Sequence, residues 1–288
     1  MGMPLDLTRR RDLGKILDDA FAFYRQHWRT LLAVAVVVVV PVHLIVYGVG
    51  LGWLWEGYNQ PPKGDVRVQD LVDNLIGLVT QLLIVTPLVT AMTVHVVRSA
   101  ASGRSVPARE ALREGFDVFG RLFVAVVLVA LGVGLGLFMF VIPGLILAVR
   151  WAVVSQVVVV EGTSGGAALN RSFELTRGRG MFAFLVLLVT NLLVGVLSAI
   201  ALVPLEIAAK SADAQAISLL GQMLGAVIAL PILAVAQTLL YYTLLIPQGA
   251  QQSVPPASPQ PAPEPGPQTL PGVPGTYGDG FAPPAPPD

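Results

Sequence analysis

The sequence predicts an all-α fold, a polytopic transmembrane helix bundle of six spans with three cytoplasmic-face amphipathic helices and a disordered Pro-rich tail. Composition is the first observation behind this prediction. Of the 288 residues, 54% are hydrophobic and 12% are charged, and the mean hydropathy is +0.71. Soluble domains carry about 25% charged residues, so we expect most of the apolar surface to meet lipid. The other two observations are a set of long apolar stretches and a one-sided distribution of basic residues.

Residues 1–30 are expected to form a cytoplasmic amphipathic N-terminal segment. Its apolar residues recur at helical spacing: Leu13, Ile16, Leu17, Ala20, Phe21, Tyr24 and Trp28. Such a helix either lies in the membrane interface or packs on the cytoplasmic ends of the spans. We expect no cleavable signal peptide, because the first apolar run begins near Leu31 and is too long.

Residues 31–246 should form the six-span membrane domain, since about 20 apolar residues cross roughly 30 Å of hydrocarbon. The expected spans are 31–54, 75–97, 122–141, 145–160, 182–203 and 217–246. The third and fourth spans form one long apolar stretch, and their separation depends on a tight turn at Pro143-Gly144. The alternative is a single kinked helix, which gives five spans.

The basic residues decide between these alternatives and set the orientation. Six spans place fourteen of the 18 basic residues on one side: Arg9, Arg10, Arg11, Lys15, Arg25, Arg29, Arg98, Arg104, Arg109, Arg113, Arg121, Arg171, Arg177 and Arg179. The other side holds Lys63, Arg67 and Lys210. Basic residues favour the cytoplasmic side, and five spans would place the Arg171 group outside. We therefore predict both termini in the cytoplasm.

The tail, residues 247–288, has a different character. About one-third of it is proline, and it contains neither Lys nor Arg. Such a segment cannot bury enough apolar surface to fold, so we expect disorder with a polyproline-II bias. Pro256-x-x-Pro259 fits either a docking motif or, the interpretation we favour, a spacer that matches by chance.

Three cytoplasmic segments share one pattern: Leu, two polar residues, a small residue, Phe, any residue, and an apolar residue. They are residues 17–23, 112–118 and 169–175. The pattern predicts three units in which Phe21, Phe116 and Phe173 each pack against the start of the following span. Three equivalent hairpins would surround an axis along the membrane normal. The alternative is a composition that suits any interfacial helix.

Several motifs resemble one bacterial family. They are residues 13–21 with Tyr24-Arg25-Gln26-His27-Trp28, Ile142-Pro143-Gly144 with Ala148-Val149-Arg150-Trp151, and Glu161-Gly162 with residues 168–172. The chain resembles, over roughly residues 5–247, the poorly characterised family related to the glycerophosphoryl diester phosphodiesterase membrane domain. The resemblance implies a six-span bundle in a bacterial cell membrane. It implies no catalysis, because the phosphodiesterase catalytic domain of the two-part proteins is absent here.

Residues that could carry chemistry are few. The absence of cysteine excludes disulfides, thiolate catalysis and Cys-ligated zinc. None of His27, His43 and His95 has an acidic residue three or four positions away, so spacing predicts no metal site. We find no phosphate-binding loop and no nucleophile elbow. We therefore expect no catalytic residue, no cofactor and no nucleic-acid partner.

Polar residues within spans are the remaining candidates, because they are costly there. Arg150, about five residues into the fourth span, either snorkels to outer lipid phosphates, pairs with freed carbonyls or a neighbouring helix, or binds an anion or lipid headgroup. The others are His43, Gln156, Asn191 and Gln237. They either line a hydrated cavity or, the interpretation we favour, form interhelical hydrogen bonds.

Small residues recur within three spans at a spacing that lets helices approach closely. The motifs are Gly48-x-x-x-Gly52, Gly132-x-x-x-Gly136 and Gly221-x-x-x-Gly225. We expect a non-catalytic scaffold or accessory protein in membrane or lipid organisation. Its partners are the lipid bilayer and either a membrane protein or a second copy of the chain. The alternative is a transporter or channel-like carrier of a lipidic or small amphipathic molecule.

Overall fold

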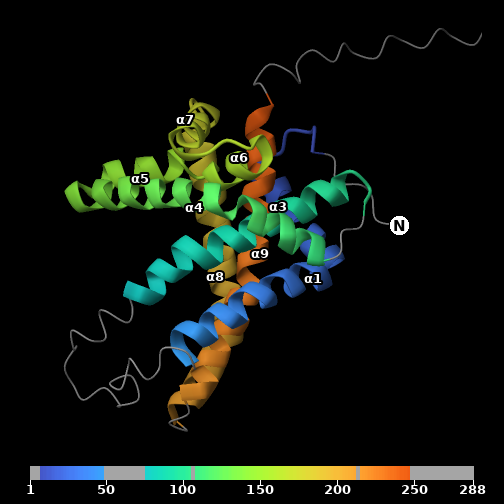
Figure 1. The fold of residues 1–288 in the computed structure, drawn as a ribbon, viewed down its shortest axis with the longest axis vertical. Helices are drawn as coiled ribbons and strands as arrows, with labels where there is room; N and C mark the ends of the chain where they lie inside the picture. The colour runs from blue at the N-terminus through green and yellow to red at the C-terminus, as the bar shows by residue number, and fades with distance from the viewer. Residues whose placement is uncertain (1–6, 49–74, 105–107, 212–214, 247–288) are drawn as a thin grey trace, which may run out of the picture. The chain divides into compact units, whose positions relative to one another are not determined.

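A computed structural model describes residues 7–48, 75–104, 108–211 and 215–246. Every regular element among them is a helix (Figure 1). In chain order they are α1 (Leu13–His43), the π-helical turns η1 (Leu44–Gly48) and η2 (Gln81–Val85), α3 (Thr86–Ala101), α4 (Ala108–Met139), α5 (Val141–Arg150), α6 (Val154–Glu161), α7 (Gly165–Thr176), α8 (Gly180–Ser211) and α9 (Gln215–Leu245). The predicted tail, with Pro256 and Pro259, lies outside the described residues.

Six segments are long and apolar enough to cross a membrane, which confirms the predicted class of multi-pass helical membrane protein. They are Leu13–Val46, Leu75–Ala101, Ala108–Met139, Val141–Glu161, Gly180–Ile200 and Leu220–Leu245. Large apolar side chains are exposed along them, including Phe138 and Ile200. Exposed apolar surface of this extent is what lipid covers.

The N-terminal segment and the first span are two helices that meet at a kink within α1. The Asp12 carboxylate accepts a hydrogen bond from the Lys15 backbone N–H at 2.8 Å and caps the first of them. The kink lies at His27, whose backbone is non-helical (φ −114°, ψ 19°), and the second helix runs from there to His43. Residues 24–31 contain neither Pro nor Gly to stop the helix, so the chain changes direction at the kink and the second helix enters the span.

The turn between the third and fourth spans lies at Phe140, not at Pro143-Gly144 as predicted. Phe140 is extended (φ −157°, ψ 137°) and precedes α5. Pro143 falls in the first turn of α5, where a missing backbone N–H has no helical partner to lose. Gly144 allows close packing, because a Cβ added to Gly136 would lie 2.9 Å from the Cα of Gly144. The two glycines therefore let α4 and α5 meet backbone to backbone.

The fourth span is broken in its middle. α5 ends at Arg150 and α6 begins at Val154, so the expected helix 145–160 is two helices within the segment Val141–Glu161. Trp151, at the break, lies against α4, where a Cβ on Gly132 would come 2.4 Å from its ring. Gly132 thus makes room for the indole.

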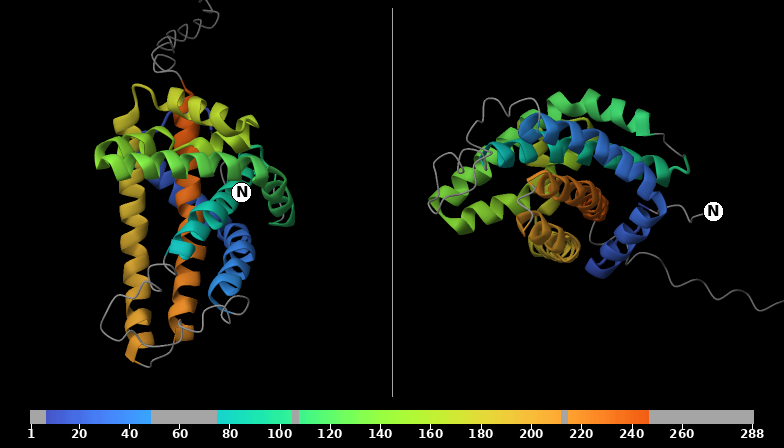
Figure 2. Two further views of the ribbon diagram at one scale, coloured as in Figure 1. Left: turned by 60° about the vertical axis from the view of Figure 1, so that its left-hand side comes forward. Right: turned by 90° about the horizontal axis from the view of Figure 1, so that it is seen from below.

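The helices pack around α9. α1 and α8 each lie along α9, α3 contacts both α4 and α9, and α6 contacts α3, α4 and α9. Figure 2 shows the α4–α5 hairpin running across the direction of α8 and α9. The core is apolar, with fully buried side chains such as Leu31, Met92 and Leu239.

The three predicted repeat units are not equivalent, so the expectation of a common arrangement is wrong. The first patterned segment is separated from its span by the kink at His27, whereas the second lies within α4 and is continuous with its span. The third forms a separate helix, α7, because Gly178 in the left-handed region (φ 74°) precedes α8. α7 packs on α4, α5, α6 and α9, and the Phe173 ring faces Arg150 instead of the start of α8.

Candidate functional site

The five predicted polar residues do not form one site. Gln156 and Gln237 come together: Gln156 Nε2 donates to Gln237 Oε1 at 3.4 Å, joining α6 to α9. His43 Nδ1 lies 2.9 Å from the Val39 carbonyl oxygen of its own helix. Asn191 donates to the Leu187 carbonyl at 2.8 Å on an exposed face of α8. The interhelical interpretation therefore holds for the glutamine pair, and the other two make hydrogen bonds within their own helices.

Arg150 ends α5 and contacts α7. It is the last residue of the ten-residue α5, about 15 Å along that helix at 1.5 Å per residue. Its guanidinium carbon is 4.8 Å from the centre of the Phe173 ring on α7, a cation–π distance. This contact fits the alternative in which Arg150 pairs with a neighbouring helix.

Polar side chains of α7 hold the backbone at the α5–α6 break. Ser172 Oγ and Thr176 Oγ1 donate to the Arg150 carbonyl at 2.9 and 3.2 Å. This carbonyl has lost its helical acceptor role because α5 ends there, and buried carbonyls need a donor. Nη1 of Arg150 is buried, and none of the described residues offers it a hydrogen-bond acceptor.

Glu161, at the end of α6, joins three helices. Both of its carboxylate oxygens accept from Arg171 Nε, at 3.1 and 3.0 Å. Tyr241 Oη, on α9, donates to Glu161 Oε1 at 2.9 Å. Next to Glu161, Arg121 Nη1 donates to the Gly162 carbonyl at 2.8 Å and ties α4 to the same place. We call Glu161, Arg171 and Tyr241 the Glu161 cluster.

Arg179, between α7 and α8, caps the end of α9. Its guanidinium donates to the carbonyls of Thr243 and Ile246 at 3.1 and 3.2 Å, and also to that of Leu244. A cation at a helix C-terminus satisfies free carbonyls and complements the helix dipole. Burial and the nearby positive charge of Arg10 lower the pKa of the Arg179 guanidinium.

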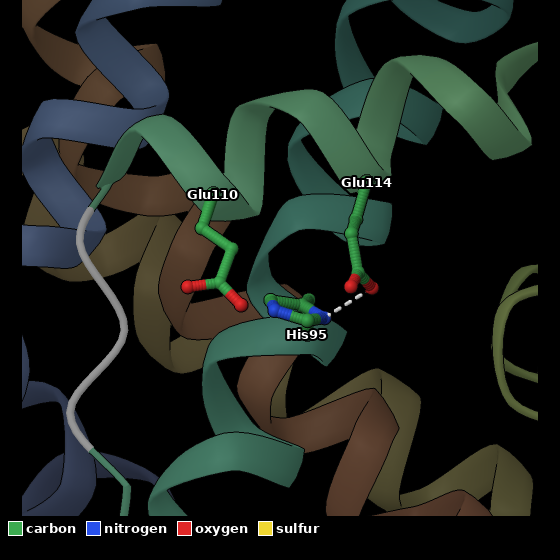
Figure 3. Close-up of side chains that lie close together, drawn as sticks. All are labelled: His95, Glu110 and Glu114. Atoms are coloured by element: carbon green, nitrogen blue, oxygen red, sulfur yellow. Dashed lines mark ion pairs between the residues drawn. The ribbon is translucent and has the colours of Figure 1, made fainter.

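One group of side chains could hold a metal ion. His95, on α3, faces Glu110 and Glu114, which lie four residues apart on α4 (Figure 3). One ligand atom from each residue can be chosen so that all three lie within 4.8 Å of one another. His95 Nδ1 is 2.6 Å from Glu114 Oε2. Sequence spacing missed this group because its acids belong to the next helix along the chain.

The fold brings these three residues together through a close contact between α3 and α4. Met92 and His95 are three residues apart and share one face of α3. A Cβ on Gly115 would lie 2.6 Å from Met92 Cγ, so α4 approaches α3 as closely as glycine allows. Glu114 precedes Gly115, and Glu110 lies one turn earlier.

Comparison with known proteins adds no identity to this geometry. No family model, no curated protein and no solved structure matches the chain.

Proposed function

We propose that this chain is a multi-pass protein of a bacterial cell membrane and that both of its termini are cytoplasmic. We further propose that it acts as a non-catalytic scaffold or accessory protein in lipid organisation. In this proposal it binds anionic lipid headgroups beside Arg150, from the cytoplasmic leaflet. Kinship with the glycerophosphoryl diester phosphodiesterase membrane domain is part of the same proposal.

The orientation is supported by where the helix ends meet. Arg10, which precedes α1, lies near Arg179, which precedes α8. Arg179 in turn binds the last carbonyls of α9. Arg121, in α4, binds the carbonyl that follows α6. If the chain has six spans and both termini are cytoplasmic, these helix ends must lie on one side of the membrane. Arg10, Arg121 and Arg179, which are among the residues predicted to be cytoplasmic, all lie at these ends.

Labelling of single cysteines tests the orientation, and the natural chain contributes no background because it has no cysteine. Gly103→Cys and Gly166→Cys should react with a membrane-impermeant maleimide only after the cells are opened. Ser211→Cys, at the end of α8 farthest from Arg179, should react in intact cells. Protection of Ser211→Cys in intact cells, or reaction of Gly166→Cys there, would contradict six spans.

The lipid proposal is carried by the buried, unpaired Nη1 of Arg150. An unpaired charged donor is costly in an apolar environment. A phosphate oxygen would remove that cost with a charge-assisted hydrogen bond. Ile142, Ile146 and Arg150 are four residues apart and share one face of α5, and both isoleucines are exposed, 72% and 53%. Arg150, itself half-buried, therefore lies at the edge of a face that lipid covers.

The test compares lipid retention by purified variants. Protein in nanodiscs of phosphatidylglycerol and phosphatidylethanolamine is analysed by native mass spectrometry. We expect the wild type to retain phosphatidylglycerol preferentially and Arg150→Gln to lose that preference. Arg177→Gln is the matched control, because Arg177 is an exposed arginine just after α7. Equal retention by Arg150→Gln and Arg177→Gln would reject the lipid site. A lipidomic comparison of a deletion strain then identifies the affected lipid class.

A carrier of a lipidic or small amphipathic molecule is the second candidate. The observation that favours it is the fully buried Gln156, whose Oε1 has no donor among the described residues. A polar substrate group passing between α6 and α9 would supply one. Uptake or flipping by proteoliposomes that Gln156→Leu abolishes would favour this alternative, whereas transport equal to that of protein-free vesicles would exclude it.

A further inference from the structure

We propose that His95, Glu110 and Glu114 form a binding site for a first-row divalent cation, such as Zn²⁺, between α3 and α4. The site is independent of the lipid proposal, because none of its residues belongs to the contacts around Arg150. It lies near the end of α3, beside Arg98, on the side that the basic residues assign to the cytoplasm.

The three side chains offer ligands that suit a transition-metal ion. One imidazole and two carboxylates form a mixed nitrogen and oxygen site, which suits Zn²⁺ and similar borderline ions more than Ca²⁺ or Cu⁺. Three protein ligands also leave a position for water, as in open zinc sites.

The distances between the ligand atoms are close to those of a metal site. Tetrahedral bonds of about 2.1 Å place ligand atoms about 3.4 Å apart. Here the three atoms lie within 4.8 Å of one another, so contraction by at most about 1.4 Å would complete the site. Glu110 and Glu114 are both exposed, and glutamate side chains change rotamer readily at a surface. His95 is the fixed member, with its side chain 12% exposed.

Two carboxylates held this close repel each other, and a divalent cation between them would offset that repulsion. His95 also has one ring nitrogen to spare: Nδ1 meets Glu114, and Nε2 is buried with no partner among the described side chains. In Figure 3 the ring lies between the two carboxylates.

The position of the pair on α4 adds a structural consequence. Glu110 is the acidic residue in the first turn of α4, and Glu114 is one turn later. An ion bound to both and to His95 would fasten the start of α4 to α3. Since the ion binds only the folded arrangement, it should raise the melting temperature with increasing concentration.

The experiment measures Zn²⁺ binding by full-length protein in detergent, purified with a tag that contains no histidine. We expect one Zn²⁺ per chain by elemental analysis after dialysis, and a melting temperature that rises on Zn²⁺ titration and returns with a chelator. His95→Gln, Glu110→Gln and Glu114→Gln should each lower the affinity for Zn²⁺. Losing a residue that only hydrogen-bonds to a metal ligand costs about 10- to 100-fold in affinity, and losing a ligand should cost at least as much.

Asp117→Asn is the matched control, since it removes one exposed carboxylate from the same helix. It should bind as the wild type does. Co²⁺ provides a second probe, because imidazole and carboxylate ligation gives visible absorption bands that the His95→Gln variant should lack. The proposal is overturned if the wild type binds no more Zn²⁺ than a variant with all three ligands replaced. It is equally overturned if Zn²⁺ leaves the melting temperature of the wild type unchanged.

Discussion

Gly144→Ala tests a close backbone contact between α4 and α5. An added Cβ would lie 2.5 Å from Leu137 N and 2.6 Å from Leu137 Cγ, against an ordinary minimum of 3.4 Å. Because Leu137 N belongs to the α4 backbone, no side-chain rotation relieves the clash. The hairpin must open by roughly 0.9 Å, and a gap of that size forfeits a quarter to a half of the dispersion well of each facing contact.

The net effect is the difference between two terms. Overpacking of this kind costs about 1–3 kcal/mol, and replacing a helical glycine with alanine returns up to about 1 kcal/mol. We therefore expect Gly144→Ala to lower the free energy of unfolding by about 1–2 kcal/mol. The assay is equilibrium unfolding in mixed detergent micelles, followed by tryptophan fluorescence, to which Trp151 at this interface contributes.

Gly134→Ala is the control, because an added Cβ there meets nothing within 4 Å. It lies on α4 in the same hairpin, so it should be neutral or slightly stabilising. Gly225→Ala separates backbone from side-chain contact, since its Cβ would meet only Leu202 Cδ1 at 2.5 Å, the end of a side chain that can turn. If Gly144→Ala unfolds no more readily than Gly134→Ala, the α4–α5 contact is not as close as described.

Three further variants follow from the contacts at the helix ends. Tyr241→Phe removes one hydrogen bond to Glu161 and should cost about 0.5–1.5 kcal/mol in the same unfolding assay, with Tyr242→Phe as control. Arg179→Gln should fray the end of α9 and raise amide hydrogen exchange there, while exchange in the middle of α9 stays unchanged. Truncation after Gln248 should leave membrane insertion and the melting temperature unchanged, because the proline-rich tail cannot contribute a core. A large fall in melting temperature would show that the tail docks.

The sequence predicted the membrane class and the number of apolar segments because both depend on composition over about twenty residues. It misplaced the α4–α5 turn because proline is tolerated in the first turn of a helix as well as in a loop. Only the meeting of Gly136 with Gly144 distinguishes those positions, and that contact depends on packing. The kink at His27 separates the amphipathic stretch from the span close to the predicted boundary, although residues 24–31 contain neither Pro nor Gly to mark it.

The candidate site was harder to predict because its partners are distant in sequence. Gln156 pairs with a residue 81 positions away, and Tyr241 reaches Glu161 over 80 positions. Because Gln156 and Gln237 are polar side chains inside spans, each was expected to need a hydrogen-bond partner from another helix, and they are each other's partner. Glu161 and His95 carried no such signal, because a lone acid at a span end and a lone histidine are common. Their importance comes from what α7, α9 and α4 bring to them.

Close packing at small residues occurs within the spans, whereas contacts between charged side chains occur at the helix ends. Within the spans, lipid is as apolar as the side chains, so helices associate through close packing at small residues. Gly132, Gly136 and Gly144 provide this for α4 and α5. At the helix ends, charged side chains can be held without full desolvation, and the Glu161 cluster and the Arg179 cap lie there.

Arg150 departs from this division, because it carries a charge in the middle of the segment Val141–Glu161. A charge in that position is retained at a cost. Its backbone is held by α7, while its Nη1 has no acceptor among the described residues, so a bound anion would offset part of that cost.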